Sequence, residues 1–235
     1  MKMAGPLYRI IMMITLSGIS LSASLQQADP YEVISRILEE QKKILDYEVE
    51  VEIEVDVEFI KMPVKHATMF YKQPDKVKFR SKDFILLPRR GLDQSLRKVI
   101  GEGYSAVFAG EEKIEGLNHW IIKVIPMNND EIVLSTLWID QESLLITRME
   151  NFTKSKGNYI ASFRYYPDLK LPSEIKISFE VKEFSIPLDF VNRTIEVDKE
   201  KMKNQEIKTG NIYLRFNGYK INKGLSDELF NDDDM

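Results

Sequence analysis

The stretch Tyr47–Glu58 reads YEVEVEIEVDVE, and it decides the fold class of this chain. An apolar residue stands at every second position, and Glu or Asp occupies every position between. Side chains of a β-strand point alternately to the two faces of a sheet. The pattern therefore predicts a strand with one buried face and one acidic, solvated face.

Further segments with the same alternation extend this strand into a sheet. Turn residues separate them at Gln73–Asp75 and Ser155–Asn158. The basic residues Lys76, Lys78 and Arg80 share one face of a short segment, and we expect that face to pair with the acidic one. The expected additional strands are residues 66–72, 76–81, 120–125, 132–139, 145–150, 159–166, 174–182 and 211–216.

One helix is expected before the sheet. Asp29 suits the N-cap position and Pro30 the first helical position. Apolar residues with helical spacing follow at Val33, Ile37, Leu38, Ile44 and Leu45. The pattern predicts a large antiparallel sheet with an N-terminal helix and short helical insertions, and such a sheet must curl or be covered to bury its apolar face.

The composition excludes several classes of protein. Hydrophobic residues make up 43% and charged residues 30% of the 235 residues, as in ordinary globular domains. The net charge of −4 provides no electrostatic attraction to nucleic acid, and the lack of cysteine excludes disulfides, thiolate metal sites and cysteine nucleophiles. His66 and His119 are the only histidines, and neither has neighbours suited to catalysis or metal binding. We therefore expect no catalytic residues, no cofactor and no bound metal.

The N-terminus has the order of a secretory signal peptide. Lys2 and Arg9 accompany an apolar run at Ile10–Leu21, and Ser22–Ser24 provides small residues for cleavage. The run is too short to cross a bilayer, which needs about 20 apolar residues. A buried N-terminal helix is the alternative, but the order of the segments favours export.

These features divide the chain into three parts. We expect residues 1–24 to be a cleaved signal peptide, residues 25–230 to form one domain, and residues 231–235 to be an acidic tail. Export of a protein without cysteine suits the periplasm of a bacterium with two membranes.

Large apolar side chains are unusually frequent at the strand positions. They either fill the core beneath the helix or line a cavity for an apolar ligand, and the pattern alone does not decide between these interpretations. The candidates for the cavity are Met69, Tyr71, Phe79, Trp120, Trp138, Phe163, Tyr165 and Phe179.

A second candidate feature is the apolar run Phe84, Ile85, Leu86 and Leu87. Four consecutive apolar residues cannot all face one core from one strand, and exposed runs of this kind usually mark contacts. We expect this run to flank the mouth of the cavity as a lid and to touch acyl chains or a membrane-bound partner.

Six short segments occur in an order that is typical of a known family. They resemble segments of LolA-type periplasmic lipoprotein carriers and of the wider outer-membrane lipoprotein-sorting group. The resemblance covers most of the chain that follows the expected signal peptide. The segments are Tyr71–Phe79 (YKQPDKVKF), Gly116–Pro126 (GLNHWIIKVIP), Leu137–Asp140 (LWID), Arg148–Glu150 (RME), Leu171–Pro172 and Gly218–Asn222 (GYKIN).

The resemblance implies an α+β fold that is mainly β: a strongly curved antiparallel sheet, or incomplete barrel, with an N-terminal helix and short helical lid elements. Its cavity would hold the acyl chains of lipoproteins. Well-known carriers latch the lid with a basic residue before the proline. Here Gln73 takes that place, and it can hydrogen-bond but cannot make the charge-assisted contact.

The expected function is therefore a monomeric periplasmic carrier that binds lipoprotein acyl chains and helps to sort lipoproteins to the outer membrane. Its partners would be lipid-modified proteins or another acyl-chain ligand, an inner-membrane donor and an outer-membrane acceptor, with no nucleic acid. The alternative is a periplasmic sensor of the same fold, which binds lipid or mislocalised lipoprotein without transporting it.

Overall fold

The computed structural model describes most of the chain that follows residue 27. The expected signal peptide, the apolar run at 84–87 and all but the first residue of the acidic tail lie outside the described residues. Within the described ranges, no helix has the length and apolar character needed to cross a membrane. These ranges are 28–81, 96–101, 103–129, 131–154, 157–181, 196–204 and 207–231.

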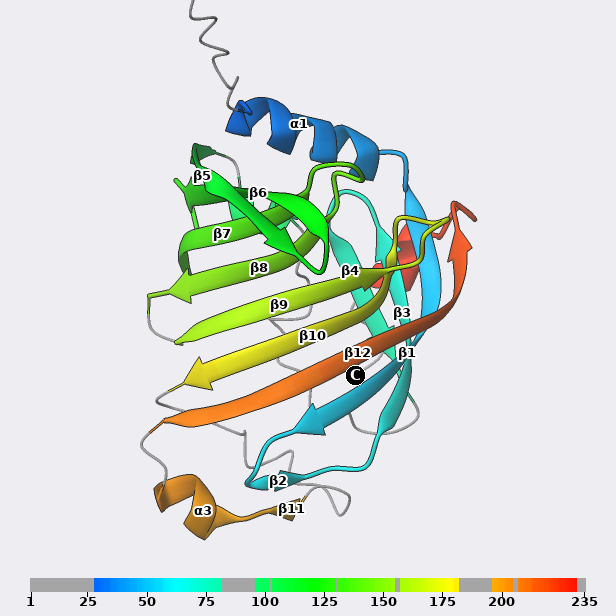
Figure 1. Ribbon diagram of the computed structural model, residues 1–235. Coiled ribbons are helices and arrows are strands. Elements are labelled where there is room, and N and C mark those ends of the chain that lie inside the picture. The colour runs from blue at the N-terminus through cyan, green and yellow to red at the C-terminus, as the bar shows by residue number, and fades with distance from the viewer. Residues whose placement is uncertain are drawn as a thin grey trace, which may run out of the picture.

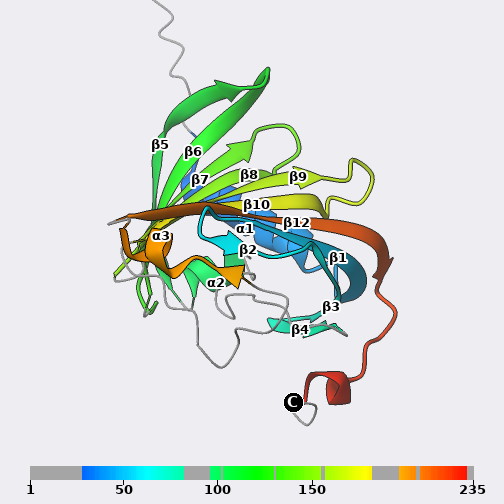
Figure 2. The same cartoon turned by 90° about the horizontal axis from the view of Figure 1, so that it is seen from below.

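Ten strands form one antiparallel sheet. Their bounds are β1 Asp46–Asp56, β3 Lys65–Lys72, β4 Lys76–Arg80, β5 Tyr104–Ile114, β6 Leu117–Pro126, β7 Ile132–Asp140, β8 Ile146–Thr153, β9 Asn158–Tyr165, β10 Pro172–Val181 and β12 Lys208–Ile221. The spatial order is β4-β3-β1-β12-β10-β9-β8-β7-β6-β5, and the two edge strands do not pair with each other. The sheet curves strongly but stays open (Figures 1 and 2), which confirms the expected fold class.

The alternating strand β1 lies well inside the sheet, between β3 and β12. Its register places Val51 opposite Phe216 and Ile53 opposite Leu214. All four of these side chains are buried. The apolar face of β1 therefore contributes to the core, as the alternation predicts.

The basic partner of the acidic face of β1 comes from β12. Arg215 contacts Glu52 and Glu54 at 2.8 Å each, and it also lies 3.2 Å from Glu174 of β10. The expectation that the basic face of β4 pairs with these acids is wrong, because β4 pairs with β3 at the sheet edge. A run of like charges identifies a solvated face but does not identify its neighbour.

Helix α1 (Pro30–Gln41) begins as expected, because the side chain of Asp29 accepts a hydrogen bond from the backbone N–H of Tyr31 at 2.9 Å. It lies along one end of the sheet (Figure 1). The helix ends before Ile44 and Leu45, which belong to the connection to β1 rather than to the helical face. That connection leads the chain into the sheet, so these two residues are not helical although their spacing fits a helix.

The core consists of two main clusters. The first joins α1 and the short helix α2 (Leu96–Ile100) to β5–β9, and the second joins β1, β3, β10 and β12. Phe163 on β9 packs against both clusters. The inner surface of the curved sheet is therefore divided between a part covered by α1 and α2 and a part formed mainly by strands.

Several elements escape the sequence analysis. Strand β5 contains a bulge between Phe108 and Gly110, which interrupts its alternation, and it ends in exposed charged residues. The short strands β2 (Ile60–Lys61) and β11 (Glu196–Val197) form a separate two-stranded sheet. Helix α3 (Lys199–Asn204) buries no residue, so it leaves no apolar pattern.

Candidate functional site

A cavity of about 330 Å³ lies between the two core clusters. Residues of both clusters line it, including Ile37 and Met149 from the first and Met69, Ile175 and Phe216 from the second. The wall is formed by strands that are distant in the chain, because β12 brings the N-terminal strands beside β10. The lining is mostly apolar, which suits a hydrocarbon ligand.

Five of the eight predicted cavity residues line this space. They come from β3, β4 and β9, and their neighbours along each strand point to the other face of the sheet. Phe163 and Tyr165 stack at 6.2 Å between ring centroids. The five lining residues are Met69, Tyr71, Phe79, Phe163 and Tyr165.

The other three candidates lie elsewhere. Trp120 packs against the first cluster. Trp138 lies on the opposite face of β7 from the buried residues Leu137 and Ile139, where its Nε1 donates to Glu112 at 2.7 Å and Arg148 lies 4.5 Å from its ring.

Phe179 packs at the border between the second cluster and a small third cluster that includes Val57 and Phe59. A Cβ at Gly210 would lie only 2.9 Å from the ring of Phe179, so the ring fills the space above this glycine. Phe179 thus packs beside β12 and is not part of the cavity wall.

Gln73 connects the turn between β3 and β4 to the end of α1. Its Nε2 donates hydrogen bonds to the carbonyl oxygens of Gln41, Lys42 and Ile44, at 3.2, 3.0 and 2.8 Å. These carbonyls lie at and just beyond the C-terminus of α1, where the helical hydrogen-bond pattern ends, and the carbonyl of Gln41 also accepts from the N–H of Ile44 at 3.2 Å. The residue therefore holds the helix to the sheet edge by uncharged hydrogen bonds. The expected lid run at 84–87 lies outside the described residues.

Tyrosines form a group at one end of the cavity. The ring of Tyr47 stacks on that of Tyr71 with 4.9 Å between the ring centroids, and it meets the ring of Tyr219 edge-on with 5.4 Å between the centroids. The hydroxyl of Tyr165 donates to the carbonyl of Ile146 at 2.7 Å, and that of Tyr219 donates to Pro172 at 2.8 Å.

Burial raises the pKa of both Tyr165 and Tyr219 above the ordinary tyrosine value. Both hydroxyls therefore stay neutral at physiological pH. This end of the cavity has hydrogen-bonded hydroxyls but presents no tyrosinate charge to a ligand.

Polar residues of the lining gather where α1 ends. Lys43 donates to Glu40 at 2.6 Å, and the Nζ of Lys170, in the turn between β9 and β10, lies 3.8 Å from the other carboxylate oxygen. The side chains of Lys43 and Lys170 are 69% and 54% exposed, so the cavity reaches solvent here. The hydrogen bond from Lys43 lowers the pKa of Glu40 below its ordinary value.

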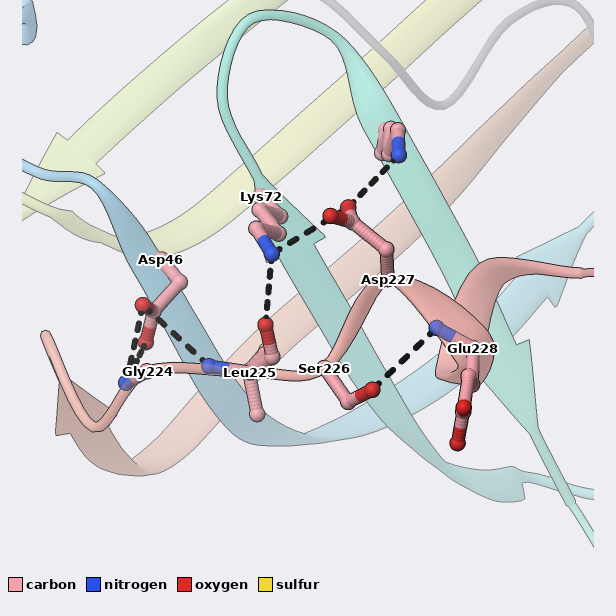
Figure 3. A network of polar contacts seen from close by, with 8 residues as sticks. Asp46, Lys72, Gly224, Leu225, Ser226, Asp227 and Glu228 are labelled. Carbon is pink, nitrogen blue, oxygen red and sulfur yellow. Dashed lines mark hydrogen bonds and ion pairs between the residues drawn. The ribbon is translucent and has the colours of Figure 1, made fainter.

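The C-terminal segment returns to the start of β1. The carboxylate of Asp46 accepts a backbone hydrogen bond from Lys223 at 2.8 Å. It also accepts one from Gly224 at 3.0 Å, which Figure 3 shows. The segment continues into the short 3₁₀ helix η2 (Asp227–Phe230), beside β4. There Lys72 and Lys76 contact Asp227 at 3.1 and 2.7 Å.

Among the described residues, no group of His, Asp and Glu is arranged to hold a metal ion. His119 is buried, and its Nδ1 lies 3.1 Å from the carbonyl of Leu117. His66 is exposed on β3. Neither residue lines the cavity, which has an apolar wall and a charged rim.

The sequence matches no protein-family model and no curated protein. Several solved structures share its fold. A domain from Vibrio parahaemolyticus described as an outer membrane lipoprotein-sorting protein has a TM-score of 0.57 and 11% identity, covering 86% of this chain and 97% of its own. A LolA superfamily protein from Nitrosomonas europaea has a TM-score of 0.53 and 12% identity, with 88% and 99% covered.

A DUF1329 family protein from Desulfovibrio piger has a TM-score of 0.55 and 13% identity, and the match covers 87% of this chain and 98% of that one. The three matches extend over nearly the whole of each solved chain. The protein therefore has a LolA-like fold: an open, curved antiparallel sheet with an N-terminal helix. This confirms the fold that the sequence resemblance implies.

Proposed function

We propose that this protein is a periplasmic carrier that binds the acyl chains of lipids or lipoproteins in the cavity between α1 and the sheet. The observation that supports this function is the apolar cavity itself, in a fold shared with a LolA superfamily protein and a lipoprotein-sorting domain. At about 330 Å³, the cavity lies at the lower end of the range for ligand sites, about 300–1,000 Å³.

Burial of hydrocarbon provides the affinity. Each methylene group removed from water stabilises the complex by about 0.8 kcal/mol, so affinity rises steeply with chain length. Ser143 of the described lining hydrogen-bonds Asp140, but that carboxylate also accepts the backbone N–H groups of Glu142 and Ser143 and so closes a turn. This arrangement favours binding and release of the ligand over its chemical conversion. The carrier is proposed to act as a monomer and to exchange its ligand with a donor at the inner membrane and an acceptor at the outer membrane.

Two measurements test this function. Mass spectrometry of the native protein purified from a periplasmic extract is expected to detect a co-purified acyl-chain ligand. The delipidated protein is then titrated with single-chain amphiphiles of increasing length, and each added methylene is expected to strengthen binding. An absence of co-purified lipid together with no binding at any chain length would overturn the proposal.

Release of the bound ligand distinguishes a carrier from a sensor of the same fold. A carrier loaded with a lipidated peptide transfers it to acceptor vesicles, whereas a sensor keeps it. Transfer from the loaded protein is the expected result.

A further inference from the structure

We propose that the ligand carries one negative charge, with its hydrocarbon chain in the cavity and its head group between Lys43 and Lys170. This inference rests on the proposed function and names the chemical class of the ligand: an acyl amphiphile with a carboxylate or phosphodiester head. The head could belong to a free fatty acid or to a phospholipid, and both share this chemistry.

The two lysines come from separate parts of the chain. Lys43 follows α1, and Lys170 lies in the turn between β9 and β10 (Figure 1). They approach opposite oxygens of one carboxylate, that of Glu40 on α1, at 2.6 and 3.8 Å. All three side chains line the cavity, although most of its wall is apolar.

The charges at this rim do not balance. Two ammonium groups and one carboxylate leave one positive charge in excess, and the lowered pKa of Glu40 is consistent with that local field. The neighbouring pair, Lys42 and Glu39, is already neutral at 2.6 Å and is not part of the lining. A head group with one negative charge neutralises this excess. A neutral head group leaves the excess in place, and a cationic head group is repelled.

The position of the charge relative to the apolar wall fits an amphiphile. Ile37, Ile44 and Leu171 line the cavity together with the lysines, so a chain can leave the charged rim directly into apolar surroundings. Lys43 and Lys170 remain half or more exposed, which lets a head group reach them from solvent. Leu169 beside Lys170 is also exposed and continues the apolar surface to the rim.

The test uses amphiphiles of one chain length with different heads. The delipidated full chain is titrated with a fatty acid, a lysophosphatidylglycerol, a monoacylglycerol and an alkyl trimethylammonium, and with inorganic phosphate and acetate alone. Both anionic amphiphiles are expected to bind about tenfold more tightly than the monoacylglycerol, the size of one charge-assisted hydrogen bond, and added salt should reduce the difference. Phosphate and acetate are expected to show no binding at the same concentrations.

Charge-matched variants locate the effect. In Lys43→Gln/Lys170→Gln the preference for anionic heads is expected to disappear, because the affinity for the anionic amphiphiles falls much more than that for the monoacylglycerol. The control Lys42→Gln/Lys113→Gln removes the same charge from exposed positions outside the cavity and should keep the preference. Thermal unfolding of both double variants shows whether they are folded.

The outcomes separate this inference from the proposed function. Equal affinity for all heads, or the same loss of preference in both double variants, would overturn the anionic-head proposal while chain-length dependence still supports an acyl carrier. Phosphate binding as tight as that of the lysophosphatidylglycerol would assign the lysines to a free anion and would also overturn it. No binding of any amphiphile would overturn the proposed function itself.

Discussion

The Nε2 of Gln73 lies 2.8 Å from the carbonyl oxygen of Ile44. Gln73 lies in the turn between β3 and β4, which is distant in sequence from the end of α1 that it contacts. The same amide group reaches the carbonyls of Gln41 and Lys42, so one uncharged side chain serves three acceptors at the end of α1. Because α1 covers one part of the cavity wall, this contact couples the edge of the sheet to the helix over the cavity.

Gln73→Ala is expected to lower the free energy of unfolding by about 1 kcal/mol, because the carbonyls of Gln41, Lys42 and Ile44 lose the side-chain donor. Gln73→Arg should retain most of the stability, since the guanidinium offers several N–H donors and its charge suits a helix C-terminus. Urea unfolding of the three proteins measures this. Asp75→Ala, at an exposed position in the same turn, is the control. Equal stability of wild type and Gln73→Ala would show that the contact contributes nothing.

Val77 allows a test of the cavity with little disturbance of the fold. It lines the cavity from the edge strand β4 and is only half-buried. Val77→Trp should place its ring in the empty volume and weaken binding of a single-chain amphiphile by about tenfold or more, which is about 1.4 kcal/mol.

Val77→Ala at the same position leaves the space open and should change the affinity much less. Isothermal titration gives both affinities, and near-ultraviolet circular dichroism checks the fold. If the tryptophan variant binds as well as wild type, the ligand does not occupy this cavity.

The local parts of the structure could be predicted from the sequence. The strict alternation of Tyr47–Glu58 identifies a strand, because the polarity of each residue shows which face of the sheet it occupies. The Asp29–Pro30 pair identifies the start of a helix, because Asp29 accepts a capping hydrogen bond and the ring of Pro30 fixes its φ angle. The same alternation placed Tyr71 and Phe163 on strand faces, and both line the cavity.

Long-range relations could not be predicted in the same way. Trp138 and Leu137 are both large and apolar, so alternation shows that they face opposite ways but not which one faces the helix. Lys43 meets Glu40 as a local pair three residues apart, but the approach of Lys170 to Glu40 depends on the order of strands in the sheet, which leaves no trace in either local segment. Strand β5 was missed because its bulge breaks the only local signal available.

The anchoring of the C-terminal segment is expected to weaken in acid. Hydrogen bonds from Lys76 and Lys72 lower the pKa of Asp227 below its ordinary value near 4. A group with a lowered folded-state pKa stabilises the fold above its unfolded pKa, and this stabilisation is lost as the pH falls through the folded pKa. The protection factors of residues 224–231, which compare the measured exchange rates with the intrinsic rates at the same pH, should therefore fall below about pH 4.

Asp227→Asn should show faster exchange in this segment already at neutral pH, with a weaker dependence on acid. Asp75→Asn removes an exposed carboxylate from the nearby turn and serves as the charge control. If the protection factors in Asp227→Asn keep a steep dependence on acid pH, the effect belongs to another carboxylate near this segment.

The buried tyrosines should make the protein less stable in alkali. Burial raises the pKa of Tyr165 and Tyr219 in the folded state, whereas both ionise near pH 10 in the unfolded chain. The unfolded state therefore loses protons first, and the free energy of unfolding falls as the pH rises beyond about 10.

Tyr165→Phe removes the hydrogen bond to Ile146 and should cost about 1 kcal/mol at neutral pH, but it should also reduce the alkaline loss of stability. Urea unfolding at several values between about pH 8 and about pH 11, with tyrosinate absorbance recorded in parallel, measures both effects. Tyr213→Phe, on the opposite face of β12 from the buried Leu214, is the control, and an identical alkaline slope in Tyr165→Phe and wild type would contradict the role assigned to the buried hydroxyl.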